Sequence, residues 1–310
     1  PNGAFGAGFL CGWTAAGNRP AIKLVTGIST GALIAPYAFL GSDYDPPLTE
    51  VFTTVNTKNV IEKYNPANIL FSKESLTAST PLRATIDKHV DMELLDNIAE
   101  AHENGRRLYI GTTHMDAQLL VVWNMGKIAT IRTDDALNLF RRILLASASV
   151  PVVMPPVLFN VEVDGTAYDE MHTDGSTATQ LFFHAGTLDL TKAWLESGSA
   201  VEDRPISRLY VIKNGKLLSE PRHVPRNLIK ISSRAFETTL KTATLHSLYR
   251  MYAFAQREQS ELFYVAIPED YTSLSKEPFD PEEMNRLFNL GFRKATSAEP
   301  WQTSMPGLAD

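Results

Sequence analysis

The sequence predicts a layered α/β fold, and three observations carry that prediction. Short runs rich in β-branched and aromatic residues alternate with helical periodicity along the 310 residues. A β-rich run, 21–26, passes through a tight turn directly into an apolar stretch, 30–41, that is typical of a buried helix. No internal repeat, low-complexity tract or clear linker divides the sequence. We therefore expect one domain, 1–310.

Composition supports a folded core and excludes several classes of function. Apolar residues make up 44% of the chain and charged residues 21%, which is ordinary globular usage. The net charge of −6 gives no electrostatic reason to expect a nucleic-acid partner. The single cysteine, Cys11, excludes an intrachain disulfide and a cysteine-based zinc site. No stretch approaches the ~20 apolar residues of a membrane-spanning helix, and no signal peptide is visible.

In the first half of the chain, glycines mark the ends of two predicted helices, one before and one after the first predicted strand. Gly17-Asn18 is a stop signal for the first helix, and Gly105 for a later one. Residues 42–80 contain several prolines and predict loops with short helices. In this half we predict helices over 4–16, 30–41, 81–90, 92–105 and 135–149, and strands over 21–26, 107–113, 118–125, 127–131 and 157–163.

Local signals fix some boundaries of the later elements. Asp135 suits the N-cap of the helix 135–149, Asp164-Gly165 is a hairpin signal, and Pro281 suits a first helical turn. In the second half we predict strands over 208–215 and 261–267, and helices over 226–257 and 281–295.

Residues 24–33, LVTGISTGAL, place Gly27, Ser29 and Gly31 in alternation between two apolar runs. One interpretation is an ordinary tight turn that happens to hold a serine. The other is a nucleophile elbow, in which a strand breaks into a helix and the serine hydroxyl projects from the bend. The strand–turn–helix setting favours the elbow, whose strained backbone leaves little room for Cβ atoms beside the serine.

A nucleophilic serine needs a base. Of the seven histidines, His223 lies in a proline-rich loop and is the best candidate for a catalytic triad. His184 and His246 have the surroundings of side chains satisfied within a core or a helix. A carboxylate is the other option, because Asp174 and Gly175 follow a strand region in the stretch YDEMHTDGSTA, although such a pair is by itself a common turn.

The same stretch also admits a metal interpretation. Asp169, Glu170, His172 and Asp174 are all possible ligands, and on a strand the last three would share one face. No second cluster of ligands is apparent in the sequence, so we expect no metal and no cofactor.

Three motifs, in the same order, resemble those of the patatin-like phospholipases. PNGAFGAG resembles the end of that family's glycine-rich oxyanion loop, with Gly3 at its last glycine. GISTG matches the elbow with Ser29 as nucleophile, and DGS resembles the Asp-Gly-Gly or Asp-Gly-Ala motif with Asp174 as base. The Ala/Ser-rich stretch 146–157 is also similar. The resemblance covers 1–184, is loose over 185–310, and implies a three-layer α/β/α fold with a mostly parallel central sheet.

The chain departs from the family pattern at three points. The earlier loop glycines and the strand that feeds them would precede Pro1, so we expect the chain to be truncated at its N-terminus. Asn2 stands where the family has Arg or Lys, and Ser176 replaces Gly or Ala. Because Pro1 has no N–H, the resemblance leaves Asn2 and Gly3 as the oxyanion donors of this chain.

The resemblance implies a lipid acyl hydrolase of the phospholipase A or lysophospholipase type. Ser29 and Asp174 would act as a dyad through an acyl-enzyme, on a phospholipid or another fatty-acyl ester, at or near a membrane surface. A carboxylesterase or thioesterase with a Ser-Asp-His triad and an inactive lipid-binding module are the alternatives. The apolar stretches 65–71, 152–159 and 245–255 would line an acyl groove or pack in the core. Relatives of this kind suggest the bacterial cell envelope as the location.

Overall fold

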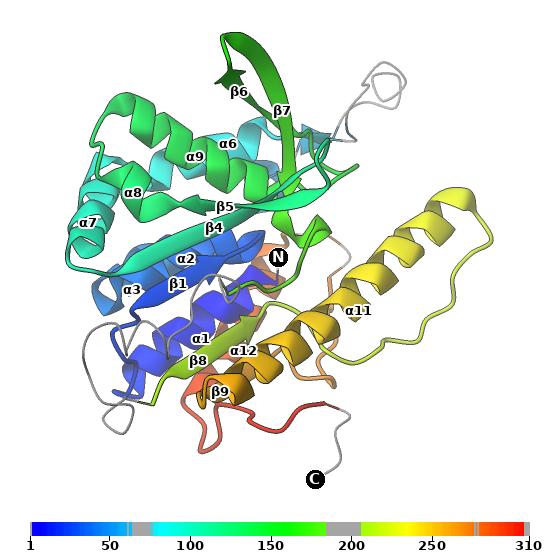
Figure 1. Ribbon diagram of the computed structural model, residues 1–310. Coiled ribbons are helices and arrows are strands. Elements are labelled where there is room, and N and C mark those ends of the chain that lie inside the picture. The colour runs from blue at the N-terminus through cyan, green and yellow to red at the C-terminus, as the bar shows by residue number, and fades with distance from the viewer. Residues whose placement is uncertain are drawn as a thin grey trace. The chain divides into compact units, whose positions relative to one another are not determined.

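The computed structural model describes residues 2–60, 62–63, 75, 77–183, 206–275, 277 and 279–306. The chain divides into two compact units (Figure 1). The first comprises Pro1–Ala178 and Thr272–Ser297, and the second comprises Thr179–Tyr271 and Ala298–Asp310. Each unit has a sheet of its own. That 1–310 act as one domain stays a prediction.

The first unit contains a five-stranded sheet of mixed sense, in which β4 is the central strand. Its strands are β1 (Leu24–Gly27), β4 (Arg107–His114), β5 (Leu119–Asn124), β6 (Val157–Val163) and β7 (Thr166–Asp174). The α/β class with a sheet flanked by helices is confirmed. The expectation of a mostly parallel sheet is wrong: β1 pairs with β4 in parallel, whereas the pairings β4–β5, β4–β7 and β6–β7 are antiparallel.

The edges of β4 determine where the chain can place a site. β5 pairs with Tyr109–His114 along one edge. β1 and β7 therefore share the opposite edge: β1 pairs with the first half of β4, and β7 with the last three residues. Because β1 is parallel to β4 and β7 is antiparallel, the two strands run toward each other and their C-terminal ends meet.

Helices of the first unit pack on this sheet and on one another. They are α1 (Gly3–Ala15), α2 (Thr30–Leu40), α3 (Asp45–Thr54), α4 (Thr57–Val60), α6 (Thr80–His89), α7 (Met92–Glu103), α8 (Met125–Ala129), α9 (Asp134–Ala148) and α12 (Pro281–Ala295). Two short 3₁₀ turns, Ser42–Tyr44 and Gly175–Thr177, and the two-stranded pair β2 (Glu62–Lys63) and β3 (Thr77–Ala78) complete it. Helices α2, α8 and α9 contact β4, and α1 packs along α12.

The glycine-rich start of the chain is a helix whose glycines allow close packing. A Cβ on Gly8 would lie 1.9 Å from the carbonyl oxygen of Phe288 in α12, and one on Gly12 would lie 2.5 Å from that of Phe292. The fit is reciprocal, because a Cβ on Gly291 would lie 2.0 Å from the carbonyl oxygen of Phe5. Small residues at this crossing bring two backbones together, so most of these glycines have a packing role.

Most element predictions are confirmed and two are wrong. The strand predicted over 127–131 is instead the helix α8, whose N-cap Asn124 accepts a hydrogen bond from the N–H of Lys127. The N-cap of α9 is Thr133 rather than Asp135; its hydroxyl accepts from the N–H of Ala136. The hairpin at Asp164-Gly165 is confirmed: both residues have positive φ, as a two-residue turn of type I′ requires.

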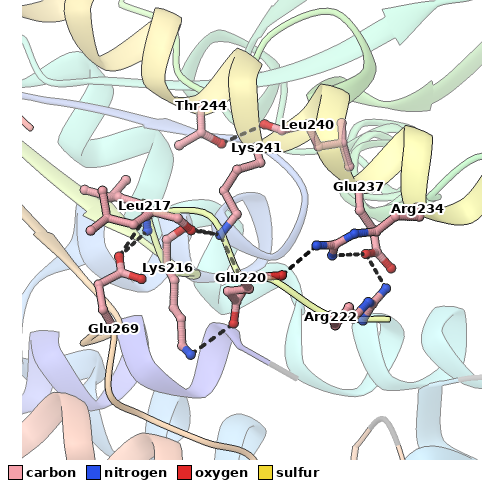
Figure 2. Close-up of polar contacts among 11 residues, drawn as sticks. Lys216, Leu217, Glu220, Arg222, Arg234, Glu237, Leu240, Lys241, Thr244 and Glu269 are labelled. Atoms are coloured by element: carbon pink, nitrogen blue, oxygen red, sulfur yellow. Dashed lines mark hydrogen bonds and ion pairs between the residues drawn. The ribbon is translucent and has the colours of Figure 1, made fainter. Parts of the chain in front are cut away.

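The second unit contains the parallel pair β8 (Arg208–Lys213) and β9 (Glu261–Ala266), and the helix α11 (Leu228–Arg257). Its core includes Leu248, Met251 and Phe254, so the stretch 245–255 contributes to core packing. Charged side chains tie the irregular segment before α11 to neighbouring elements (Figure 2). In that network Glu220 pairs with Lys216 and Lys241, while Glu269 accepts the N–H groups of Leu217 and Leu218.

The part of the chain that the structure describes contains no helix capable of spanning a bilayer. The apolar stretch 65–71 and His184 lie outside the described residues.

Candidate functional site

The strand–turn–helix geometry expected at Ser29 is present. β1 ends at Gly27, α2 begins at Thr30, and Ser29 between them has φ 56° and ψ −130°. A non-glycine residue with positive φ is strained by about 1–3 kcal/mol and persists only where its surroundings hold it. This is the backbone that a nucleophile elbow requires.

A buried serine supports the turn at Ser29. The N–H of Ser29 donates a hydrogen bond to the hydroxyl of Ser147 at 3.1 Å, and that hydroxyl donates to the carbonyl of Gly111 at 2.7 Å. Ser147 lies near the end of α9 and is fully buried. Ser147 is not among the residues predicted from the sequence, although it belongs to the Ala/Ser-rich stretch 146–157. A serine in an otherwise apolar buried helix end was the available signal.

The two motif glycines beside Ser29 differ in their surroundings. A Cβ on Gly27 would lie 2.6 Å from the carbonyl oxygen of Gly31 and 2.8 Å from Cα of Ala32, so Gly27 is required by close packing. Outside its chain neighbours and the backbone of its own helix, a Cβ on Gly31 would meet no atom of the described residues within 4 Å. The expectation that both flanking glycines lack room for a side chain therefore holds for Gly27 and is wrong for Gly31. The space at Gly31 is open.

Asp174 is the last residue of β7 and is fully buried. Its Oδ1 accepts a hydrogen bond from the N–H of Ser176 at 2.8 Å, and its own N–H donates to the carbonyl of Ser149 at 2.9 Å. In the β4–β7 register Asp174 lies opposite Thr112. These backbone bonds fix the direction in which the strand delivers its carboxylate.

The ends of β1 and β7 meet on the shared edge of β4. Gly27 lies opposite Ile110, and Asp174 lies opposite Thr112, so only Gly111 separates the two positions along β4. Two residues of strand correspond to about 7 Å. At the junction, a Cβ on Gly175 would lie 2.5 Å from the carbonyl oxygen of Gly111 and 3.2 Å from Cγ2 of Ile28. The fold thus brings together the segments that carry Ser29 and Asp174.

The start of α1 lies beside the same turn. A Cβ on Gly3 would lie 1.9 Å from Cγ2 of Thr30, the first residue of α2. Asn2, which is exposed, precedes the helix and forms no side-chain cap bond. The N-termini of two helices therefore converge next to Ser29, and each presents N–H groups without intrahelical partners and a positive dipole end.

A second group of titratable side chains lies on β4 and β7. His172 is fully buried, and its ring contacts the rings of Phe159, Trp123 and His114. Its Nε2 lies 3.2 Å from Oε2 of Glu170. Burial lowers the pKa of His172 below its ordinary value, because desolvation disfavours the charged ring. Asp169 is exposed.

The remaining described histidines differ in setting. His89 and His102 lie at the ends of α6 and α7 in the first unit. In the second unit His223 is exposed in an irregular segment, and His246 is exposed on α11 rather than satisfied in a core.

Comparisons with known proteins identify the family to which this chain belongs. A search of the curated proteins found no match. Among solved structures, the crystal structure of VipD from Legionella pneumophila is similar, with a TM-score of 0.40 and 12% sequence identity. That match covers 95% of this chain but only 64% of VipD, less than two thirds of its length. The profile of the patatin-like phospholipases matches residues 1–180, which include both Ser29 and Asp174. The chain therefore belongs to the patatin-like phospholipase family.

Proposed function

We propose that the chain is a lipid acyl hydrolase in which Ser29 is the nucleophile and Asp174 the base. The observation that carries this proposal is the meeting of β1 and β7 end to end on one edge of β4. It joins the strained turn at Ser29 to the buried aspartate over about two residues of strand. Family membership supports hydrolysis of lipid esters.

In both halves of the proposed reaction, Asp174 accepts a proton and then passes it on. Asp174 takes the proton of Ser29 Oγ while the oxygen attacks the ester carbonyl, and the tetrahedral intermediate collapses to an acyl-enzyme. The proton on Asp174 passes to the departing alcohol. Asp174 then takes a proton from water, whose oxygen attacks the acyl-enzyme. As the fatty acid leaves, Asp174 returns this proton to Ser29 Oγ, which restores the serine hydroxyl and the carboxylate. Burial supports this role, because electrostatic interactions are stronger where water is excluded.

Negative charge on the carbonyl oxygen requires donors beside the nucleophile. The converging helix ends supply them: the N–H groups of Asn2 and Gly3 at the start of α1, and that of Thr30 at the start of α2. Contact between Gly3 and Thr30 supports a shared position for these groups. Gly31 leaves open space beside Ser29 for the substrate.

An exposed apolar surface near β6 supports binding to lipid. Within the stretch 152–159, Met154 and Phe159 are buried, whereas Val152 is 67% exposed and Leu158 44%. We propose that this surface contacts a membrane. Leu158→Asp should weaken sedimentation with phosphatidylcholine vesicles, whereas Ile131→Asp, at another exposed apolar position after α8, should not. Equal sedimentation of both variants would exclude this surface. Location in the bacterial cell envelope stays a prediction.

Fluorophosphonate labelling tests the nucleophile. The wild-type chain should be labelled and Ser29→Ala should not. Ser149→Ala should keep the label, because it removes only a buried hydroxyl that donates to the carbonyl of Leu145 in α9. Labelling that persists without Ser29 would contradict the proposal. Failure of the wild type to label, with vesicle binding retained, would favour an inactive lipid-binding module.

Turnover of a short-chain ester and of phosphatidylcholine tests the base. Asp174→Asn should remove activity, and Asp169→Asn, at an exposed position of the same strand, should retain it. The alternative is a carboxylesterase or thioesterase with a triad. Single His→Ala changes at all seven histidines distinguish the dyad from the triad. Loss of Ser29 labelling in one variant would indicate a triad that includes that histidine. His223 is the first candidate to test.

A further inference from the structure

We propose that His114, Glu170 and His172 form a binding site for one divalent transition-metal ion of the zinc type. One ligand atom from each of the three side chains lies within 4.8 Å of the other two. Two imidazoles and one carboxylate are a ligand set that zinc uses in proteins. This proposal does not depend on the hydrolase activity proposed above.

Strand register assembles the three ligands. His114 is the last residue of β4 and lies opposite His172 on β7. Glu170 precedes His172 by two residues on the same strand, so it lies on the same face. From the sequence we expected no metal, and the metal interpretation set aside there grouped Glu170 and His172 with Asp174. The structure replaces Asp174 with His114, which lies 172 − 114 = 58 residues upstream of His172 and is joined to it only by register.

The distances fit tetrahedral coordination after a small movement. Ligand atoms about 2.0–2.1 Å from a tetrahedral zinc ion lie about 3.3 Å from each other. Nε2 of His172 lies 3.2 Å from Oε2 of Glu170, and Nε2 of His114 lies 3.6 Å from Oε1 of the same carboxylate. The two contacts use different oxygens of the carboxylate, so one of them corresponds to an edge of the tetrahedron, and the three ligand atoms already lie within 4.8 Å of one another. To bind one ion, the carboxylate must present one oxygen to both imidazoles, and the ligand atoms must close from within 4.8 Å to about 3.3 Å.

Residues around His172 hold its ring in one orientation, as the hydrogen-bond partners of a metal-binding histidine do. Its Nδ1 lies 2.8 Å from the hydroxyl of Thr112, which also accepts a hydrogen bond from the indole N–H of Trp123 at 2.7 Å. With the proton on Nδ1, this contact leaves the lone pair of Nε2 for a metal. The rings of Trp123 and Phe159 form an apolar wall beside the imidazole.

His114 must change one hydrogen bond to bind the ion. Its Nδ1 accepts from the N–H of Ala117 at 3.2 Å, which places the proton on Nε2. Ligation through Nε2 moves that proton to Nδ1, so the bond to Ala117 breaks. Ala117 lies in the exposed turn between β4 and β5, where backbone N–H groups can bond to water. Loss of this hydrogen bond therefore affects only an exposed turn.

Three protein ligands leave a fourth tetrahedral position to water. Glu170 retains 33% side-chain exposure, so its side provides an entry path for the ion, whereas His172 has none. Asp174 follows His172 by two residues on the same strand face, about 7 Å along β7. A bound ion would cross-link β4 to β7 next to the end that carries Asp174.

Titration with Co²⁺, followed by its visible absorption, tests the site. The titration uses the Ser29→Ala variant of the 310-residue chain, so that hydrolase activity cannot affect the result. We expect one equivalent of Co²⁺ with absorption typical of tetrahedral coordination, displaced by Zn²⁺. His114→Ala and Glu170→Gln should each lower the affinity by more than about 100-fold, beyond the 10–100-fold typical of losing an outer-shell partner.

His223→Ala and His246→Ala are matched controls, because both remove exposed histidines of the second unit. They should bind Co²⁺ as before. Zn²⁺ should also raise the Tm of the Ser29→Ala protein and leave that of its His114→Ala derivative unchanged. Absence of stoichiometric binding, or an affinity that survives His114→Ala and Glu170→Gln, would overturn the proposal.

Discussion

The amide of Ser29 and the hydroxyl of Ser147 are joined by a hydrogen bond of 3.1 Å that spans 118 residues of sequence. The same hydroxyl donates to the carbonyl of Gly111, so one buried side chain connects the turn after β1, the end of α9 and the centre of β4. Ser147 contributes no reacting atom. It is a positioning residue that supports the positive φ of Ser29.

Ser147→Ala should slow acylation of Ser29 more than it weakens substrate binding. The change leaves the N–H of Ser29 and the carbonyl of Gly111 without this partner, at a cost of about 1–3 kcal/mol in the free energy of unfolding. We expect kcat to fall about tenfold or more with little change in KM. Steady-state kinetics and the rate of fluorophosphonate labelling measure the effect.

Ser149→Ala is the control, since its hydroxyl is equally buried but donates only to the carbonyl of Leu145 within α9. An equal loss of kcat in both variants would show that general damage to the helix end, rather than the bond to Ser29, is responsible.

Substitution of Gly27 and Gly31 should show that only the tightly packed glycine is required for stability, although both belong to the same sequence motif. Gly27→Ala places a methyl group against the backbone of α2 and should lower the free energy of unfolding by about 1–3 kcal/mol. Gly31→Ala enters open space within a helix and should raise it by up to about 1 kcal/mol. Chemical denaturation of both variants measures the difference. Equal destabilisation would contradict the open space at Gly31.

Local patterns predicted the elements well because periodicity and caps act over a few residues. The turn at Ser29 was identified because strand, turn and helix are contiguous in sequence. The sense of the sheet was not predictable in this way. β7 is the second strand of the hairpin at Asp164-Gly165. Its direction, antiparallel to β1, is set by its pairing with β4, which the sequence does not reveal.

Tertiary contacts explain the other differences. Residues 127–131 contain β-branched side chains, yet Asn124 caps a helix there and Gly126 packs against His102 of α7. Asp174 required the family resemblance as well as the residues, because an Asp-Gly pair is usually a turn. His114 and Ser147 reach the site region through register and helix packing, which no short stretch of sequence reveals.

Arg19 and Asp45 form a largely buried ion pair of 2.7 Å, with side-chain exposures of 5% and 15%. Arg19 also donates to the carbonyl of Ala38, so it ties the segment after α1 to α2 and α3. Arg19→Ala should lower the free energy of unfolding by about 3 kcal/mol, because Asp45 would keep a buried charge without this partner. Urea denaturation measures the change.

Lys88→Ala is the matched comparison, because the pair of Lys88 and Glu50 is exposed on both sides. Exposed ion pairs are screened by water and salt, so the stability should not change measurably. A loss as large as that of Arg19→Ala would show that burial does not decide the strength of these pairs.

Cys11 reports on the packing of α1 because it is the only cysteine of the chain. Burial raises the pKa of its thiol from the ordinary 9.0 to about 11. The folded thiol loses its proton at higher pH than the unfolded one, so its contribution to stability is present below pH 9 and is lost as the pH rises toward 11. The reactive thiolate is correspondingly rare in the native chain at pH 8.

Ellman's reagent should therefore react with native Cys11 at least about 100-fold more slowly than with the chain in guanidinium, where one thiol per chain reacts. Gly12→Ala provides the contrast. Its methyl group would collide with Phe292 where α1 packs on α12, and a loosened α1 should expose the neighbouring thiol and raise the native rate. Rapid reaction of the native wild type would contradict the burial of α1, since neither desolvation nor steric protection would then act on the thiol.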